Sequence, residues 1–442
     1  MNRRTFSLSL VVLFVQSVVT ASSLHAENWP NWRGPKNNGV SGEKNLPAEW
    51  SKEKNVAWRL PLPGRAGATP VVWGERIFLT TVSGNDLVLM CINTEGEVLW
   101  EQPMAQGNVI ARSDEGDSAS PSPSTDGEHV WAMVTPGERN AYMGVLGCYT
   151  LDGKEVWKFN VHDRYGTFQI QFGMSSTPVL HGDRLYLQLI HGDGDAKTRE
   201  ALIVAIDKLT GDEIWRQDRP SDGIAENEQS YASPIVYDYG NLQLLLTHGA
   251  DYIVAHDLND GSEVWRCGGL NPKNDAVKRY DPTLRFVASP AAVEGMIVVP
   301  TAKAGPVLAL KPNYKGDVTN NEEARIWKHD RTPDVPSPVI FDGITYLCME
   351  NGNLHALDSK TGKLNYEVRT TAVRHRASPV YADGKLYLTS RDGIVTVVKA
   401  GKEFEILSQN QLEEEMSASP VIANGTIYLR TFDALWAIRE GK

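Results

Sequence analysis

The sequence has little cysteine and a shortage of basic side chains. Its 442 residues include only 4 Cys, and none of these forms an adjacent pair, a Cys-x-x-Cys or a Cys-x-x-Cys-His motif. This spacing excludes a disulfide scaffold and a covalently attached haem, and it favours free, buried thiols. The net charge of −11 disfavours nucleic acid or an anionic membrane surface as the main partner.

Long apolar runs are also missing, except for Phe6–Val19 near the N-terminus. This run follows the pair Arg3-Arg4, precedes small and polar residues, and is too short to span a bilayer. We therefore expect residues 1–26 to be a cleaved export signal, with Ala26 or alternatively Ala21 as the last residue removed. The general secretory and twin-arginine routes both remain open. We expect a periplasmic or secreted monomer without a membrane anchor.

An internal repeat is the strongest feature of the sequence. A small residue or Pro, then Ser/Thr-Pro and an apolar pair, recurs eight times at spacings of 51, 57, 56, 56, 48, 41 and 41 residues. The repeated prolines are Pro70, Pro121, Pro178, Pro234, Pro290, Pro338, Pro379 and Pro420. A four-stranded period of this length is typical of a β-propeller blade. Proline suits the first residue of a strand, where its missing N–H is not needed.

A second element follows in most copies. An apolar strand ends near a small residue, and a glycine turn then leads into a strand that carries Trp. These tryptophans are Trp58, Trp100, Trp157, Trp215, Trp265 and Trp327. Each ring can stack between blades while its N–H finds a backbone acceptor, so we interpret the six as blade-docking residues.

The ends of the repeat predict how the ring closes. The eighth copy stops after Ala434–Ile438, before a fourth strand, while an unpaired fourth-strand pattern begins the first copy at residues 55–59. We expect Val56–Leu60 to complete the last blade, because this pairing removes two exposed edges. The sequence thus predicts an all-β, eight-bladed propeller over residues 55–442.

The motif Ala-x-Asp-x-x-Thr-Gly-x-x-x-Trp at Ala205–Trp215 resembles the tryptophan-docking motif of the pyrroloquinoline quinone (PQQ) repeat family. Residues 28–35 and 46–50 also resemble the lead-in of exported members of this family, most of which have no assigned function. The family includes quinoprotein alcohol dehydrogenases and non-enzymatic relatives such as the outer-membrane assembly propeller. The resemblance therefore implies either a PQQ-dependent oxidoreductase with Ca²⁺ or a binding protein without a cofactor.

Residues 27–54 lack the period of a helix or a strand, yet they contain three tryptophans, at positions 29, 32 and 50. Three Trp side chains are costly to leave in water, so we expect an irregular strap packed against the ring. The alternative is an arm that binds a partner.

Propeller ligands bind at a mouth of the axial channel, where the loops that precede the innermost strands converge. The candidates selected by this rule are Arg65, Asp117, Met174, Gln229, Tyr231, Arg285, Phe286, Asp334, Arg374, His375, Arg376 and Glu415. Arginine captures carboxylates and phosphates. One hypothesis is therefore an anion, such as a quinone carboxylate or an acidic sugar, held by Arg285, Arg374 and Arg376. The alternative is that these polar loop residues pair with one another.

The sequence favours a binding or scaffolding propeller without catalysis, for a protein or a cell-envelope polysaccharide. No metal site is assigned. The alternative is a PQQ-dependent alcohol or sugar dehydrogenase, but the sequence lacks the adjacent cysteine pair of those enzymes and is shorter. Fold membership by itself does not carry function.

Overall fold

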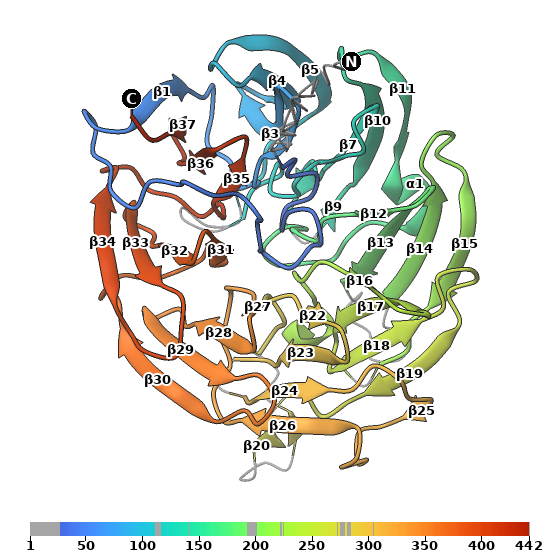
Figure 1. The fold of residues 1–442 in the computed structure, drawn as a ribbon. Helices are drawn as coiled ribbons and strands as arrows, with labels where there is room; N and C mark the ends of the chain where they lie inside the picture. The colour runs from blue at the N-terminus through green and yellow to red at the C-terminus, as the bar shows by residue number, and fades with distance from the viewer. Residues whose placement is uncertain are drawn as a thin grey trace, which may run out of the picture.

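A computed structural model describes residues 27–110, 116–139, 141–191, 201–221, 223, 225–271, 273–274, 279–280, 284–303 and 305–441. The expected export signal, residues 1–26, lies outside this range. Eight antiparallel sheets surround a central axis (Figure 1). This arrangement confirms the predicted eight-bladed, all-β propeller.

The innermost strands line the axis. They are β2 (Val71–Trp73), β6 (Ser124–Thr125), β12 (Val179–His181), β16 (Ile235–Tyr239), β22 (Ala291–Val293), β27 (Val339–Phe341), β31 (Val380–Ala382) and β35 (Val421–Ala423). Seven of them begin directly after a predicted proline. In the second blade Pro121 was predicted to precede the innermost strand. This prediction was wrong by two residues, because β6 begins after Pro123.

The second strands are β3 (Arg76–Ser83), β7 (His129–Val134), β13 (Arg184–Ile190), β17 (Leu242–Gly249), β23 (Met296–Pro300), β28 (Ile344–Cys348), β32 (Lys385–Thr389) and β36 (Thr426–Arg430). The third strands are β4 (Asp86–Asn93), β10 (Val145–Thr150), β14 (Ala201–Asp207), β18 (Tyr252–His256), β24 (Val307–Leu310), β29 (Asn353–Asp358), β33 (Ile394–Lys399) and β37 (Ala434–Ile438). Nearly every residue of these two layers is buried, so the core follows the middle of each blade.

The outermost strands are β5 (Val98–Gln106), β11 (Glu155–Asn160), β15 (Glu213–Asp218), β19 (Glu263–Cys267), β26 (Arg325–His329), β30 (Leu364–Arg369), β34 (Ile406–Gln411) and β1 (Val56–Pro61). Strand β1 pairs with β37, with Leu60 opposite Leu435. The N-terminal strand therefore completes the last blade, as predicted.

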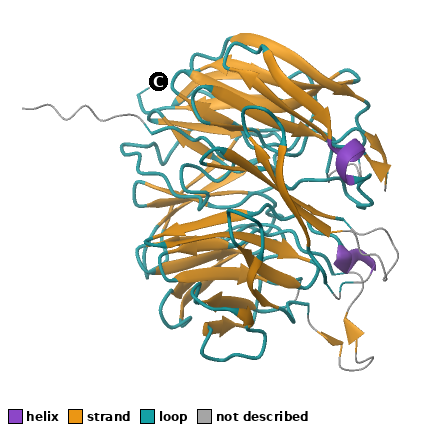
Figure 2. Cartoon of the chain, turned by 90° about the vertical axis from the view of Figure 1, so that its right-hand side faces the viewer, coloured by secondary structure: helices purple, strands orange, loops and turns teal. Residues whose placement is uncertain are grey.

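The remaining short elements lie in the longer loops. They are β8 (Gly137–Glu138), β9 (Ala141–Tyr142), β20 (Lys273–Asn274), β21 (Arg279–Tyr280), β25 (Gly316–Asp317), the helix α1 (Val161–Tyr165) and a 3₁₀ turn at Ala225–Glu228. The two helical segments lie on one face of the ring, and the C-terminus lies on the opposite face (Figure 2). None of the described helices is long and apolar enough to cross a membrane.

A closed belt of hydrogen bonds joins the eight blades near the axis. In each blade the backbone N–H of the Ser or Thr before the strand-initiating proline donates to the hydroxyl of the equivalent residue in the next blade, over 2.9–3.2 Å. In order around the ring these residues are Thr69, Ser122, Thr177, Ser233, Ser289, Ser337, Ser378 and Ser419, and Ser419 donates back to Thr69. The belt explains why the repeat requires a hydroxyl before each proline.

The Trp side chains join the blades farther from the axis. The six indole Nε1–H groups of Trp58, Trp100, Trp157, Trp215, Trp265 and Trp327 each donate to a backbone carbonyl of the next blade, over 2.7–3.2 Å. In the third blade Trp215 pairs across the sheet with Ala205. Its ring lies so close to Gly261 that a Cβ there would be 2.5 Å away.

The four cysteines are all buried and free. Cys91 lies opposite Trp100 and Cys148 opposite Trp157, so both occupy the small position of their blades. Burial raises the pKa of Cys91 and Cys148 to about 12. These thiols therefore stay protonated and serve as small packing residues.

The strap, residues 27–54, lies on the face where the innermost strands end. The backbone of Trp29 exchanges two 2.8 Å hydrogen bonds with Val72 of β2, and the Trp29 side chain is fully buried. The Arg33 guanidinium donates to the carbonyls of Ser337 and Pro338 on the far side of the axis. In Figure 1 this dark-blue segment crosses the centre of the ring. The strap thus fills one end of the axial channel.

Candidate functional site

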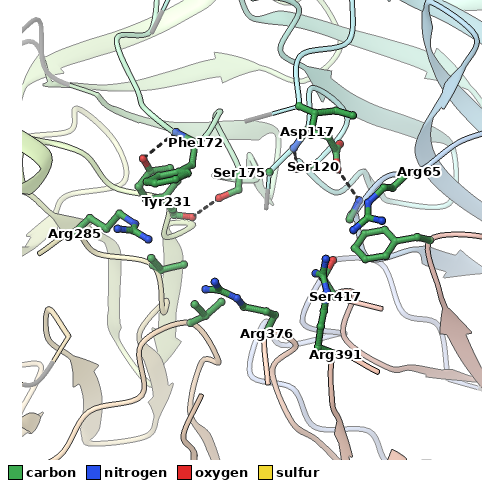
Figure 3. Close-up of a pocket in the computed structure, with 16 residues that line it drawn as sticks. Arg65, Asp117, Ser120, Phe172, Ser175, Tyr231, Arg285, Arg376, Arg391 and Ser417 are labelled. Atoms are coloured by element: carbon green, nitrogen blue, oxygen red, sulfur yellow. Dashed lines mark hydrogen bonds between the residues drawn. The ribbon is translucent and has the colours of Figure 1, made fainter. Parts of the chain in front are cut away.

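A pocket of about 210 Å³ lies on the axis at the other end of the channel, where the innermost strands begin (Figure 3). All eight blades contribute to its lining. The lining residues are Arg65, Gly67, Ile110, Gly116, Asp117, Ser120, Phe172, Ser175, Tyr231, Arg285, Val287, Val335, Arg376, Arg391, Ser417 and Phe432. The loops that precede the innermost strands therefore converge as the sequence argument expected.

The structure brings together part of the predicted site. Arg65, Asp117, Arg285 and Arg376 line the axial pocket, together with Tyr231. Their side chains approach the pocket from different blades, and Figure 3 shows Arg285 and Arg376 extending toward its centre. This arrangement places five of the twelve candidate side chains where one small ligand could contact them.

The other candidates lie elsewhere. Asp334 and Arg374 line a second, more polar pocket of about 540 Å³ beside the mouth. His375 is fully buried, and its Nδ1 lies 3.1 Å from the carbonyl of Val373. Gln229 accepts a hydrogen bond from the Tyr231 hydroxyl behind the pocket wall. Glu415 is mostly exposed and pairs with arginines of the mouth. The proposed trio of Arg285, Arg374 and Arg376 therefore does not surround a single pocket.

Arg65 and Arg391 flank one aromatic ring on the same side of the mouth. Their guanidinium carbons lie 3.7 Å and 4.5 Å from the centroid of the Phe432 ring. Glu415 is shared between them, with N···O distances of 3.4 Å to Arg65 and 3.8 Å to Arg391. Contacts with an aromatic face limit the freedom of both guanidinium groups and hold them at the pocket edge.

Arg285 and Arg376 form the opposite side of the mouth. The Arg285 guanidinium lies 4.4 Å from the centroid of the Phe172 ring and 3.3 Å from Glu226. Arg376 is nearly buried, and its Nη1 lies 3.6 Å from Glu350. Neither Glu226 nor Glu350 lines the pocket. Both guanidinium groups therefore belong to the pocket lining, and each pairs with a carboxylate outside the described lining.

Asp117 is the single carboxylate among the lining residues that the structure describes. It is buried, and its two oxygens accept hydrogen bonds from the backbone N–H groups of Gly67 and Ala119 over 3.1 Å and 2.8 Å. Burial raises the pKa of Asp117, although the charge of Arg430 and these hydrogen bonds oppose the rise. The backbone contacts fix the carboxyl group in one orientation at the pocket wall.

A carboxyl pair connects the two pockets. Burial, together with the hydrogen bond to Glu350 and its charge, raises the pKa of Asp334. Burial also opposes the ionisation of Glu350, but the hydrogen bond from Asp334 and the charges of Arg376 and Arg374 lower its pKa. Lys303 lies 3.6 Å from Asp334. Glu350 therefore contacts Arg374, which lines the second pocket, and Arg376, which lines the axial pocket.

Arg391 and Phe432 were not among the residues predicted from the sequence. Both follow the second strand of a blade, in the loops after β32 and β36, whereas only the loops before the innermost strands were considered. These loops reach the same mouth because the second strand runs antiparallel to the first. A search that included both loops of each blade would have found the two residues.

The donor set of the pocket does not fit a calcium-bound quinone. Calcium takes six to eight oxygen ligands, whereas the described lining offers one carboxylate, which already accepts two backbone hydrogen bonds. Four arginines in the lining would also repel a divalent cation. Within the described part of the chain, no group of three His, Cys, Asp or Glu residues could hold a metal ion.

The fold and the tryptophan repeat define the chain as a PQQ-like propeller. The sequence model of the family described as outer membrane protein assembly factor BamB matches residues 142–313 and 250–441. The chain therefore belongs to this family. A curated relative, the outer membrane protein assembly factor BamB of Yersinia pestis, is 23% identical, over 49% of this chain and 64% of that protein. The match thus spans less than two thirds of that relative.

Solved structures share the fold. BamB from Moraxella catarrhalis matches with a TM-score of 0.60 and 14% identity, over 87% of this chain and 99% of that one. Quinohemoprotein alcohol dehydrogenase from Comamonas testosteroni matches with a TM-score of 0.50 and 13% identity, over 94% of this chain and 81% of that one. At these identities the likeness shows the fold alone, so function must be argued from the site.

Proposed function

We propose that this chain is an exported, monomeric binding and scaffolding propeller of the cell envelope that acts without catalysis. Membership of the BamB family supports an assembly or scaffolding role with protein or polysaccharide partners. The axial pocket is the binding site, and its ligand carries negative charge. The observation that carries this proposal is the convergence of four arginines from three blades on one pocket.

The charge distribution supports an anion. The whole chain is acidic, with a net charge of −11, yet the lining residues that the structure describes include four arginines and one carboxylate. A guanidinium has five N–H donors, so an arginine that pairs with a carboxylate can also donate to a ligand. Partial pairing of the arginines, the alternative raised by the sequence, therefore does not prevent anion binding.

Retention on a carboxylated matrix tests the proposed role. The mature chain, residues 27–442, should be retained at low salt despite its acidity, and it should elute as salt screens the arginines. The double variant Arg285→Gln/Arg376→Gln should pass through the column. The matched control is Arg216→Gln, since Arg216 lies on β15 and is 58% exposed. Equal retention of the double variant and the wild type would contradict the proposal.

The absence of catalysis needs its own test. The mature chain is incubated with PQQ and Ca²⁺ and assayed with a redox dye on primary alcohols and aldose sugars. We expect no turnover and no change in quinone absorbance or melting temperature. Turnover that depends on both PQQ and Ca²⁺ would overturn the non-catalytic role and favour the dehydrogenase alternative.

A further inference from the structure

We infer that the axial pocket binds one anionic sugar unit, a uronic acid or a sugar sulfate, with its charge between Arg285 and Arg376 and its hydroxyl groups toward Asp117. This inference rests on the proposed binding function and names the ligand class of the same pocket. Three features of the lining carry it: the placement of the charges, the presence of hydroxyl partners, and the size and apolar content of the cavity.

The charges are divided between two sides of the pocket. Arg285 and Arg376 extend toward the centre from one side, and Asp117 lies across from them beside Ser120 (Figure 3). A carboxylate or a sulfate accepts bidentate hydrogen bonds from arginine, which makes Arg285 and Arg376 the anion-binding side. Arg65 and Arg391 lie on the same side as Asp117, where both pair with Glu415. A second negative group on that side would meet the carboxyl groups of Asp117 and Glu415. The arrangement therefore favours a ligand that is anionic at one end and a hydrogen-bond donor at the other.

The side opposite the two arginines offers partners for hydroxyl groups. An ionised carboxyl group has about four acceptor positions. Asp117 uses two for the backbone N–H groups of Gly67 and Ala119, and the Ser120 side chain also hydrogen-bonds to it. The remaining lone pairs can accept from ligand hydroxyls. Ser120 and Ser417 also line the pocket, and a hydroxyl both donates and accepts. Neighbouring donor and acceptor groups of this kind suit the vicinal hydroxyls of a sugar ring.

The size of the cavity limits the ligand to a single unit. A volume of about 210 Å³ is below the roughly 300 Å³ at which pockets for drug-sized ligands begin. An extended peptide or an oligosaccharide cannot be enclosed, although its terminal residue can. Phe172, Val287 and Val335 supply apolar surface for the C–H faces of a sugar ring. An inorganic anion would leave this surface and the Asp117 side without a partner.

Calorimetric titration of the mature chain tests the inference. The probes are D-glucuronate and D-glucose 6-sulfate, with D-glucose, inorganic sulfate and a short poly-glutamate peptide as comparisons. We expect both anionic sugars to bind, and glucose and sulfate to bind at least about 10-fold more weakly, since each lacks half of the contacts. A preference between the two anionic sugars would identify the carboxylate or the sulfate as the natural group.

Variants assign the binding to the pocket. Arg376→Gln should weaken glucuronate binding about 10-fold or more, because a charged donor is lost. Ser417→Ala, which removes one neutral hydroxyl, should weaken it a few-fold. Arg216→Gln on the outer strand β15 should leave the affinity unchanged. Circular dichroism and melting temperature establish that each variant is folded, and the Ser417→Ala variant provides a second test if Arg376→Gln does not fold.

The outcomes separate this inference from the proposed function. Binding of poly-glutamate without binding of either sugar would overturn the sugar assignment and leave an anion-binding role that depends on Arg376. Equal affinity for glucuronate and inorganic sulfate would also overturn it, because the hydroxyl side of the pocket would then contribute nothing. Failure of every anionic probe would overturn both the sugar assignment and the proposed function.

Discussion

The two ends of the axial channel use arginine in different ways. At the strap end, Arg33 is buried, and its N–H groups donate to the backbone carbonyls of Ser337, Pro338 and Asn38. At the open end, Arg285 pairs with Glu226 and Arg376 with Glu350, and both arginines line the axial pocket. An arginine whose donors are used by the fold stabilises the structure, whereas one that faces a cavity is placed to bind. The strap therefore fills one end of the channel, and the other end is open to a ligand.

The largest effect on stability is expected at the strap end. Trp29→Ala removes a fully buried indole that packs against the first and last blades, which should lower the free energy of unfolding by about 3–5 kcal/mol. Denaturant unfolding of the mature chain measures the change. Lys36→Ala, an exposed position of the strap, is the control. A loss below about 1 kcal/mol would mean that the strap is an arm rather than part of the core.

Acid should destabilise the open end before the strap end. Burial, followed by the charge of Arg219, lowers the pKa of His248 and His256 to about 3. Because the unfolded histidines bind protons below about pH 6.5 and the native ones do not, stability is present above this pH and falls as the pH drops toward 3. The loss is about 2–3 kcal/mol per histidine between pH 6.5 and 4.5. His248 contacts Phe286, the neighbour of Arg285, so the mouth should loosen first.

Unfolding measured from pH 8 to pH 4 checks this dependence. His256→Asn should reduce the slope of stability against pH below pH 6.5, because one of the two buried sites is removed. His181→Asn is the matched control, since the His181 side chain is 31% exposed. An unchanged slope in His256→Asn would show that other groups cause the acid sensitivity.

A smaller effect on the free energy of unfolding is expected at the belt of hydrogen bonds, which joins the blades near the axis. Ser233→Ala removes the hydroxyl that accepts from the backbone N–H of Thr177 and leaves this buried group without its belt partner. The cost should be about 1–3 kcal/mol. Ser221→Ala, in a loop outside the belt, is the control, and thermal unfolding compares the two. Equal stability of the two variants would show that the belt contributes little to closure.

The smallest effect on stability is expected at the open end itself. Arg376→Gln should lower the free energy of unfolding by about 1 kcal/mol or less, because Glu350 keeps its 2.8 Å contact with Arg374 and the glutamine amide keeps two N–H donors. Its effect on ligand binding should be much larger than its effect on folding. A loss of stability comparable to that of Trp29→Ala would mean that Arg376 is structural, and the contrast between the two ends would fail.

The repeat made most of the fold predictable. Eight Ser/Thr-Pro elements determined the number of blades, and the missing fourth strand of the last copy identified the role of Val56–Leu60 in closure. The second blade was misread because Pro121 and Pro123 both follow Ser, so the local pattern fits two registers. The structure shows that the second proline, Pro123, begins the strand. Ser122, the residue before it, accepts from the Thr69 N–H and donates to the Thr177 hydroxyl, as the belt requires.

The site was only partly predictable, for a geometric reason. Arg374 and Arg376 are two residues apart, yet they face different pockets, and their sequence positions alone do not show which one faces the axis. Arg391 belongs to a different loop of the same blade and reaches the mouth because the chain reverses between β31 and β32. The strap position was likewise beyond sequence reasoning, since no periodicity shows which face it covers.

A crystal structure of residues 27–442 soaked with D-glucuronate tests the central claim most directly. The account predicts density for one sugar in the axial pocket, with its carboxylate against Arg285 and Arg376 and its hydroxyls near Asp117. The strap end should remain filled by Trp29 and Arg33, without ligand. Density for the sugar at the strap end, or an empty axial pocket under conditions where binding is measured in solution, would contradict the account.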